Sequence, residues 1–143
     1  MTKMTFFKQI PLLFISISSL ISPLAHATYG HYEQNGKGFM VDLDSIQLLN
    51  KQKTKFNVSA NLIGFIESHD IPKSMLNQVE SKANLFVDCT AKTLAFQSVQ
   101  VIYKPDGRVL MENDQPNFKM SATKNNKMET YMIEDLCKTA STR

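Results

Sequence analysis

Two cysteines, Cys89 and Cys137, constrain the fold of this chain more than any other feature, because they are its only cysteines and lie far apart in the sequence. Such a pair could serve catalysis, metal binding or a disulfide bond. The spacing is not CxxC, which argues against a thioredoxin-like redox site. Together with three histidines, the two cysteines do not form a zinc-binding spacing. The choice therefore depends on the compartment in which the protein folds.

The first 27 residues, MTKMTFFKQIPLLFISISSLISPLAHA, have the layout of a cleaved secretory signal. Lys3 and Lys8 supply the positive charge, and the following stretch to Ile21 is apolar or small. Ala25-His26-Ala27 has the small-x-small form that a signal peptidase accepts. An uncleaved anchor is the alternative. The apolar run of about 12 residues is shorter than the roughly 20 that a membrane span needs.

Cleavage after Ala27 would leave residues 28–143 as a single domain, located in the periplasm or on the outer cell surface. No second apolar segment is long enough to span a bilayer, so no stable membrane span is expected after cleavage. In an oxidising compartment, a pair of cysteines is most simply a disulfide. We therefore predict a Cys89–Cys137 bond.

The net charge gives no reason to expect a nucleic-acid partner. The whole chain carries a formal charge of +3, and loss of Lys3 and Lys8 with the signal lowers this by two. A nucleic-acid-binding domain would need a strongly basic surface.

The segment KFNVSANL contains the clearest strand signal in the chain. Phe56, Val58, Ala60 and Leu62 alternate with polar residues, which is the period of a strand with one solvated face. Antiparallel sheets commonly expose one face in this way, whereas parallel sheets rarely do. The segment therefore favours an antiparallel sheet.

Similar but shorter patterns predict the other strands. Asn35-Gly36 favours a tight hairpin between two of them. Asp44-Ser45 is expected to end the strand that begins at Phe39, since both side chains can bond to nearby backbone amides. A change of apolar phase near Gln97-Ser98 indicates a β-bulge, or else a strand covered on both faces. The further strands are expected at residues 28–34, 39–43, 85–89, 93–104 and 108–111, with irregular segments at 64–83 and 113–123.

A single helix is predicted near the C-terminus. Asn126 fits an N-cap, with Glu129 three residues later as in a capping box. An apolar stripe at helical spacing follows, made of Met128, Met132, Ile133, Leu136 and Cys137. A bond from Cys137 to Cys89 would clamp this helix onto the sheet. The expected fold class is α+β, an antiparallel sheet of five or six strands with one C-terminal helix packed on it and tied by a disulfide.

Two short segments contain the residue types of a catalytic site or a metal site. Ser68-His69-Asp70 has the residue types of a hydrolase triad, but sequence neighbours rarely converge on one another, and a solvated loop is favoured. Asp42, Asp44 and Ser45 could offer oxygen ligands to calcium. The EF-hand spacing is missing, so turn capping is favoured.

The remaining charged residues suggest surface roles. Glu134 and Asp135 are adjacent on the helix and point in different directions, so they are expected to aid solubility rather than act as an acid–base pair. His31 is expected on the surface, with a pH-sensitive or metal contact as the alternative.

Lys51, Lys53 and Lys55 form a basic cluster that could contact sulfated glycans, lipopolysaccharide phosphates or an acidic protein surface. Protection of an exposed strand edge is the alternative role for these lysines. The three residues are the only partner-binding candidates that the sequence offers, and no catalytic, metal or cofactor residues are assigned.

The order of these motifs resembles the surface-adhesin protein E family of Gram-negative bacteria over most of residues 28–143. The matching segments are Val41-Asp42-Leu43-Asp44-Ser45-Ile46, Asp88-Cys89-Thr90-Ala91-Lys92, Tyr103 with Asp106-Gly107, and Leu136-Cys137. The family commonly has tryptophan near the mature N-terminus and before the last helix, and this chain has none. The resemblance implies an exported antiparallel sheet with a helix, dimers in some members, and binding to host matrix or serum proteins in the type member.

The sequence therefore predicts an exported binding protein that is not an enzyme and needs no cofactor. Its partner would be a host extracellular protein or a periplasmic protein, and a homodimer is also expected as one assembly. The alternative is a periplasmic inhibitor or immunity-type protein that docks on a partner enzyme.

Overall fold

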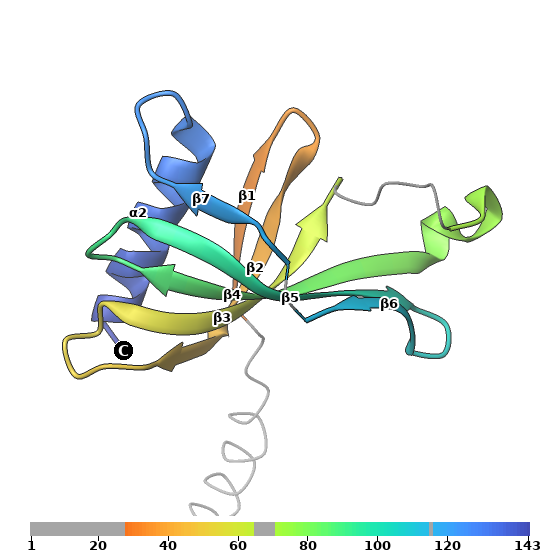
Figure 1. Ribbon diagram of the computed structural model, residues 1–143, viewed down its shortest axis with the longest axis horizontal. Helices are drawn as coiled ribbons and strands as arrows, with labels where there is room; N and C mark the ends of the chain where they lie inside the picture. Colours follow the sequence, from red (N-terminus) through yellow and green to blue (C-terminus); the bar gives the residue numbers. More distant parts are fainter. Residues whose placement is uncertain (1–27, 65–70, 115) are drawn as a thin grey trace, which may run out of the picture.

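The computed structural model describes residues 28–64, 71–114 and 116–143. They form a seven-stranded antiparallel sheet with one C-terminal α-helix on one face (Figure 1). The predicted α+β class is confirmed, and the sheet has one strand more than expected. The elements are β1 (Tyr29–Gln34), β2 (Lys37–Leu48), β3 (Lys55–Ile63), the 3-10 helix η1 (Lys73–Gln78), β4 (Val79–Asp88), β5 (Thr93–Tyr103), β6 (Arg108–Asn113), β7 (Lys119–Ser121) and α2 (Lys127–Ser141).

Strands β1 to β6 follow one another across the sheet in chain order, each antiparallel to the next. The short strand β7 pairs with the beginning of β5. The predicted Asn35-Gly36 hairpin is confirmed, since both residues have positive φ, 55° and 77°, as the tight turn between β1 and β2 requires. In Figure 1, β6 and η1 lie at the end of the sheet away from α2.

The core lies between one face of the sheet, here called the inner face, and α2. On β3 the predicted alternation is confirmed, because Phe56, Val58, Ala60 and Leu62 are all buried. The helix contributes the buried residues Met132, Ile133, Leu136 and Ala140, which confirms most of the predicted stripe and extends it by one turn. Burying the apolar surface of these residues is the main stabilising contribution to the fold.

A β-bulge lies where the apolar phase of β5 changes. Asn84 pairs with Ser98 and Leu85 pairs with Phe96, so Gln97 has no opposite residue on β4. The bulge lets Phe96 and Val99 share the inner face although they are three positions apart. This confirms the bulge and excludes the alternative that a strand covered on both faces explains the pattern.

The prediction that Asp44-Ser45 ends a strand is wrong, because β2 continues to Leu48. The two side chains do bond nearby backbone, but within an irregular part of β2 where its pairing with β3 is interrupted. Ser45 Oγ donates to the Asp42 carbonyl at 2.6 Å and accepts from the Ser59 N–H at 2.8 Å. Pairing with β3 resumes at Gln47, so the neighbouring strand overrides the local turn signal.

Two segments expected to be irregular contain strands. β4 begins at Val79 rather than at the predicted Leu85. The sequence pattern missed its first half because two of the buried inward positions there are the small residues Ser81 and Ala83, which weaken the apolar alternation. β7 is only three residues long, and Met120 is its one buried side chain.

The predicted capping box at the start of α2 does not form. Asn126 is the N-cap but makes no side-chain capping bond. The Thr130 hydroxyl instead donates to the Thr123 carbonyl at 2.9 Å, which ties the first turn of α2 to the preceding loop.

Candidate functional site

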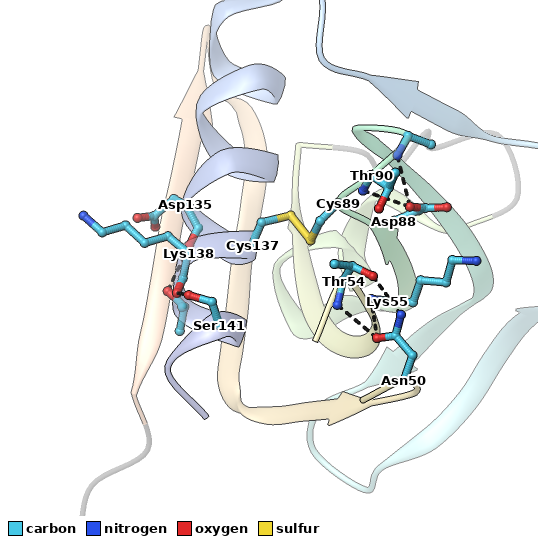
Figure 2. The surroundings of a disulfide bond; sticks show 12 residues. Asn50, Thr54, Lys55, Asp88, Cys89, Thr90, Asp135, Cys137, Lys138 and Ser141 are labelled. Carbon is cyan, nitrogen blue, oxygen red and sulfur yellow. Dashed lines mark hydrogen bonds between the residues drawn. A yellow bond between two sulfur atoms is a disulfide. The ribbon is translucent and has the colours of Figure 1, made fainter. Parts of the chain in front are cut away.

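The disulfide between Cys89 and Cys137 is present and joins the end of β4 to the middle of α2 (Figure 2). The two Cα atoms lie 5.8 Å apart, which is a normal separation for a disulfide. The Cys89 N–H donates to the Thr54 carbonyl at 2.7 Å, so the strand side of the bond is held by the sheet. Both cysteines pack against the core. The pair fastens the helix to the sheet.

A second link between α2 and the sheet was not predicted. The Tyr32 hydroxyl donates to Asp135 Oδ2 at 2.5 Å. Burial, and then the hydrogen bond and negative charge of Asp135, raise the pKa of Tyr32 above its ordinary value. The expectation that Asp135 serves only solubility is therefore wrong, whereas Glu134 is exposed. No local sequence pattern indicates the Tyr32–Asp135 bond, because β1 and α2 lie far apart in the chain.

The three lysines of the basic cluster lie around the connection from β2 to β3. Lys51 and Lys55 are exposed, whereas Lys53 is partly buried and its Nζ donates to the Arg143 carbonyl. Lys55 pairs across the sheet with Asp88. Since β3 lies between β2 and β4, edge protection is the wrong explanation for Lys55. Lys51 and Lys55 remain candidates for contact with an anionic partner.

Asp42, Asp44 and Ser45 form local hydrogen bonds. Asp42 Oδ1 accepts from the Asp44 N–H at 3.1 Å, and Asp44 Oδ2 accepts from the Thr28 N–H at 2.9 Å. Arg143 Nη1 lies 3.8 Å from Asp44 Oδ1. The predicted turn is absent, and these side chains instead bond to backbone groups in and beside the irregular part of β2. Within the described ranges, no three His, Cys, Asp or Glu side chains come together in a way that could hold a metal ion.

Other predicted candidates fall on the surface or outside the described residues. His31 is exposed, and its Nε2 lies 2.9 Å from Glu33 Oε2. Ser68-His69-Asp70 and the signal segment of residues 1–27 lie outside the described residues. None of the helices in the described ranges combines the length and the apolar character that crossing a bilayer requires.

Strand β6 forms the free end of the sheet, called here the β6 edge. In the part of the chain that the structure describes, β6 pairs with β5 on one side and with no strand on the other. Val109 and Met111 are 44% and 43% exposed. Natural edge strands are usually protected by lysine, proline or a bulge. β6 contains neither lysine nor proline, and its one such feature is a bulge at Leu110, where its register with β5 shifts.

The charged residues of β6 stand on either side of this apolar centre. The Arg108 guanidinium lies 5.7 Å from the centroid of the Tyr103 ring, a cation–π distance. Glu112 Oε1 accepts from Gln100 Nε2 at 2.9 Å. Both side chains are therefore positioned by β5. The β6 edge combines a side that pairs with no strand in the described ranges, exposed apolar side chains and one charge of each sign.

No protein-family model matches the chain, and no curated protein matches its sequence.

Proposed function

We propose that this protein is an exported, non-enzymatic binding protein of the surface-adhesin E type, which recognises a protein partner through the β6 edge. The exposed edge strand, whose outer side pairs with no strand in the described ranges, is the observation that carries the proposal. A segment of a partner would add to the sheet as a further strand. Its backbone would bond to N–H and C=O groups on the outer side of residues 109–112, which is a common mode of peptide recognition.

The side chains of β6 would supply specificity. Val109 and Met111 offer apolar contacts, while Arg108 and Glu112 favour opposite charges at the two ends of the added segment. The most favourable partner segment is therefore extended, apolar at its centre, and charged at both ends.

The same edge is the proposed contact of a homodimer. In such a homodimer, two copies of β6 would pair antiparallel and join the two sheets edge to edge. A two-fold interface uses the same surface of both copies, as this pairing would.

Binding can be tested with the oxidised protein, residues 28–143, passed over immobilised extracellular-matrix and serum proteins by surface plasmon resonance. Saturable binding that Val109→Lys/Met111→Lys weakens at least tenfold would support the proposal. Leu49→Lys/Tyr131→Lys is the matched control, because it changes two apolar side chains that are 50% and 62% exposed elsewhere. Absence of binding to every protein would contradict the adhesin function, and equal binding by the β6 variant would contradict the edge.

Protease accessibility on intact cells distinguishes the proposed adhesin function from the alternative function of a periplasmic inhibitor. Digestion of the protein on intact cells would support surface exposure and adhesion. Protection until the outer membrane is opened would contradict adhesion and favour a periplasmic enzyme as the partner of the β6 edge.

A further inference from the structure

A row of polar side chains crosses the outer face of the sheet, opposite α2. Each member pairs with the next on the neighbouring strand, so the row spans five strands, a width of about 19 Å at ~4.8 Å per strand. In order across the sheet, its members are Tyr29, Asp42, Ser59, Asn84 and Ser98.

Hydrogen bonds fix the centre of this row. The Ser59 hydroxyl donates to Asn84 Oδ1 at 3.2 Å, and Asn84 Nδ2 donates to Ser98 Oγ at 3.0 Å. An asparagine side chain has two N–H donors and two acceptor lone pairs, so Asn84 keeps one donor and one acceptor site for a ligand. The row of polar side chains therefore presents donors and acceptors that are already oriented for a ligand.

A second row runs parallel to the first, and a cavity of about 270 Å³ lies between them. Lys82 and Asp42 are the only charged residues that line the cavity among those the structure describes. Lys82 Nζ also lies 3.5 Å from Glu80 Oε1 on the same strand. The second row consists of Met40, Asn61, Lys82 and Gln100, each paired with the next.

A further cavity of about 260 Å³ lies on the other side of the first row. Gln97 at the β5 bulge and Gln47 after the irregular part of β2 help to line it, so both irregularities of the sheet contribute to its wall. The Asn57 Oδ1 atom is buried here and has no protein hydrogen-bond partner in the described ranges. A ligand that donates a hydrogen bond to this buried oxygen would remove the free-energy cost of leaving it without a partner. The two cavities together form what we call the outer groove.

The lining of the outer groove selects a chemical class of ligand. Amide and hydroxyl groups predominate in this lining, and the charges of its one basic and one acidic residue offset each other. A sulfated or phosphorylated ligand would need several arginines or lysines. An apolar ligand would need a mainly hydrophobic wall. An added peptide strand would bond to a sheet edge rather than to a face.

Densely hydroxylated, uncharged molecules match this lining. Sugar hydroxyls both donate and accept, as do the free sites of Asn84 and of the Ser98 hydroxyl. The Asp42 carboxylate adds an acceptor, and the Tyr29 side chain, 53% exposed at the end of the row, offers an apolar surface for a sugar ring.

We propose that the outer groove is a binding site for a neutral oligosaccharide, held across strands β1 to β5 with Asn84 at its centre. This site lies on the face of the sheet and is separate from the β6 edge, so it goes beyond the proposed protein-binding function. Either site could be present without the other.

A glycan array probed with labelled, oxidised protein of residues 28–143 tests the proposal. The array carries neutral, sialylated and sulfated oligosaccharides. We expect binding to neutral glycans, with the strongest of them then titrated in solution by NMR. Shifts in that titration should concentrate on the outer groove and leave β6 unchanged.

The decisive variant is Asn84→Ala, which removes the central amide while its own side chain is exposed and outside the core. We expect its affinity for the titrated glycan to fall at least tenfold. Gln52→Ala removes an exposed amide from the β2–β3 connection and should bind like wild type. Binding to sulfated or sialylated glycans alone, no binding to any neutral glycan, or unchanged affinity of Asn84→Ala would each overturn the proposal. Val109→Lys/Met111→Lys should retain glycan binding, which separates this test from that of the β6 edge.

Discussion

Removing the disulfide should destabilise the protein strongly. The bond joins residues separated by 48 positions, so it restricts a long loop in the unfolded chain. In the chain-entropy model, a loop of this length corresponds to about 4 kcal/mol of stability. A domain of this size loses roughly 4 °C of melting temperature per kcal/mol, so the expected decrease is about 16 °C.

The assay is thermal unfolding of residues 28–143, followed by circular dichroism under oxidising conditions. Cys89→Ala/Cys137→Ala is the main variant, because it leaves no free thiol. Wild type treated with a reductant should melt close to this variant, and the reductant should not change the variant itself. Each single variant, Cys89→Ala or Cys137→Ala, should also melt well below wild type. A decrease of less than about 5 °C in the double variant would refute the reasoning, since it would mean that the loop entropy is not a major stabilising contribution.

Four further outcomes are expected. Tyr32→Phe should lower the free energy of unfolding by about 1.5 kcal/mol, measured by urea titration, because Asp135 loses its donor. Because the pKa of Tyr32 is raised in the folded state, its contribution is constant below about pH 10 and is lost above it, so wild type should lose more stability than Tyr32→Phe between pH 10 and 11.5. Gly38→Val should reduce the yield of folded protein, measured by size-exclusion chromatography, because a Cβ at this buried position would overlap the Tyr32 carbonyl oxygen. Deletion of Gln97 should be tolerated better than deletion of Gln100, measured by urea titration, because only the second deletion moves the following residues of β5 to the opposite face. Equal losses from the two deletions would contradict the assigned register.

Much of the fold could be predicted because its signals are local. The alternation from Phe56 to Leu62 and the Asn-Gly hairpin each depend on neighbouring residues, and the phase change at Gln97 is visible within one strand. Strand β7 could not be predicted in this way, because its three residues are stabilised by pairing with a strand more than twenty positions earlier. The continuation of β2 past Ser45 likewise depends on β3, whose pairing resumes on the far side of the irregularity.

The candidate sites were less accessible to sequence reasoning. Residues 108–111 could be predicted as a strand, but their position at a free edge follows from the order of all strands in the sheet. The partner of Asp135 lies about a hundred positions away, so no local pattern indicates the bond. The row through Ser59 and Asn84 likewise requires the register of five strands, which adjacent residues do not encode.

The most direct test of the proposed function is amide hydrogen exchange in β6, with and without the matrix or serum protein that binds most tightly in the resonance assay. If a partner strand adds to the β6 edge, the outward-facing amides of residues 109–112 should exchange at least tenfold more slowly in the complex. Amides of α2 serve as the internal reference and should not change. Unchanged exchange in β6 at saturating partner would contradict recognition through this edge.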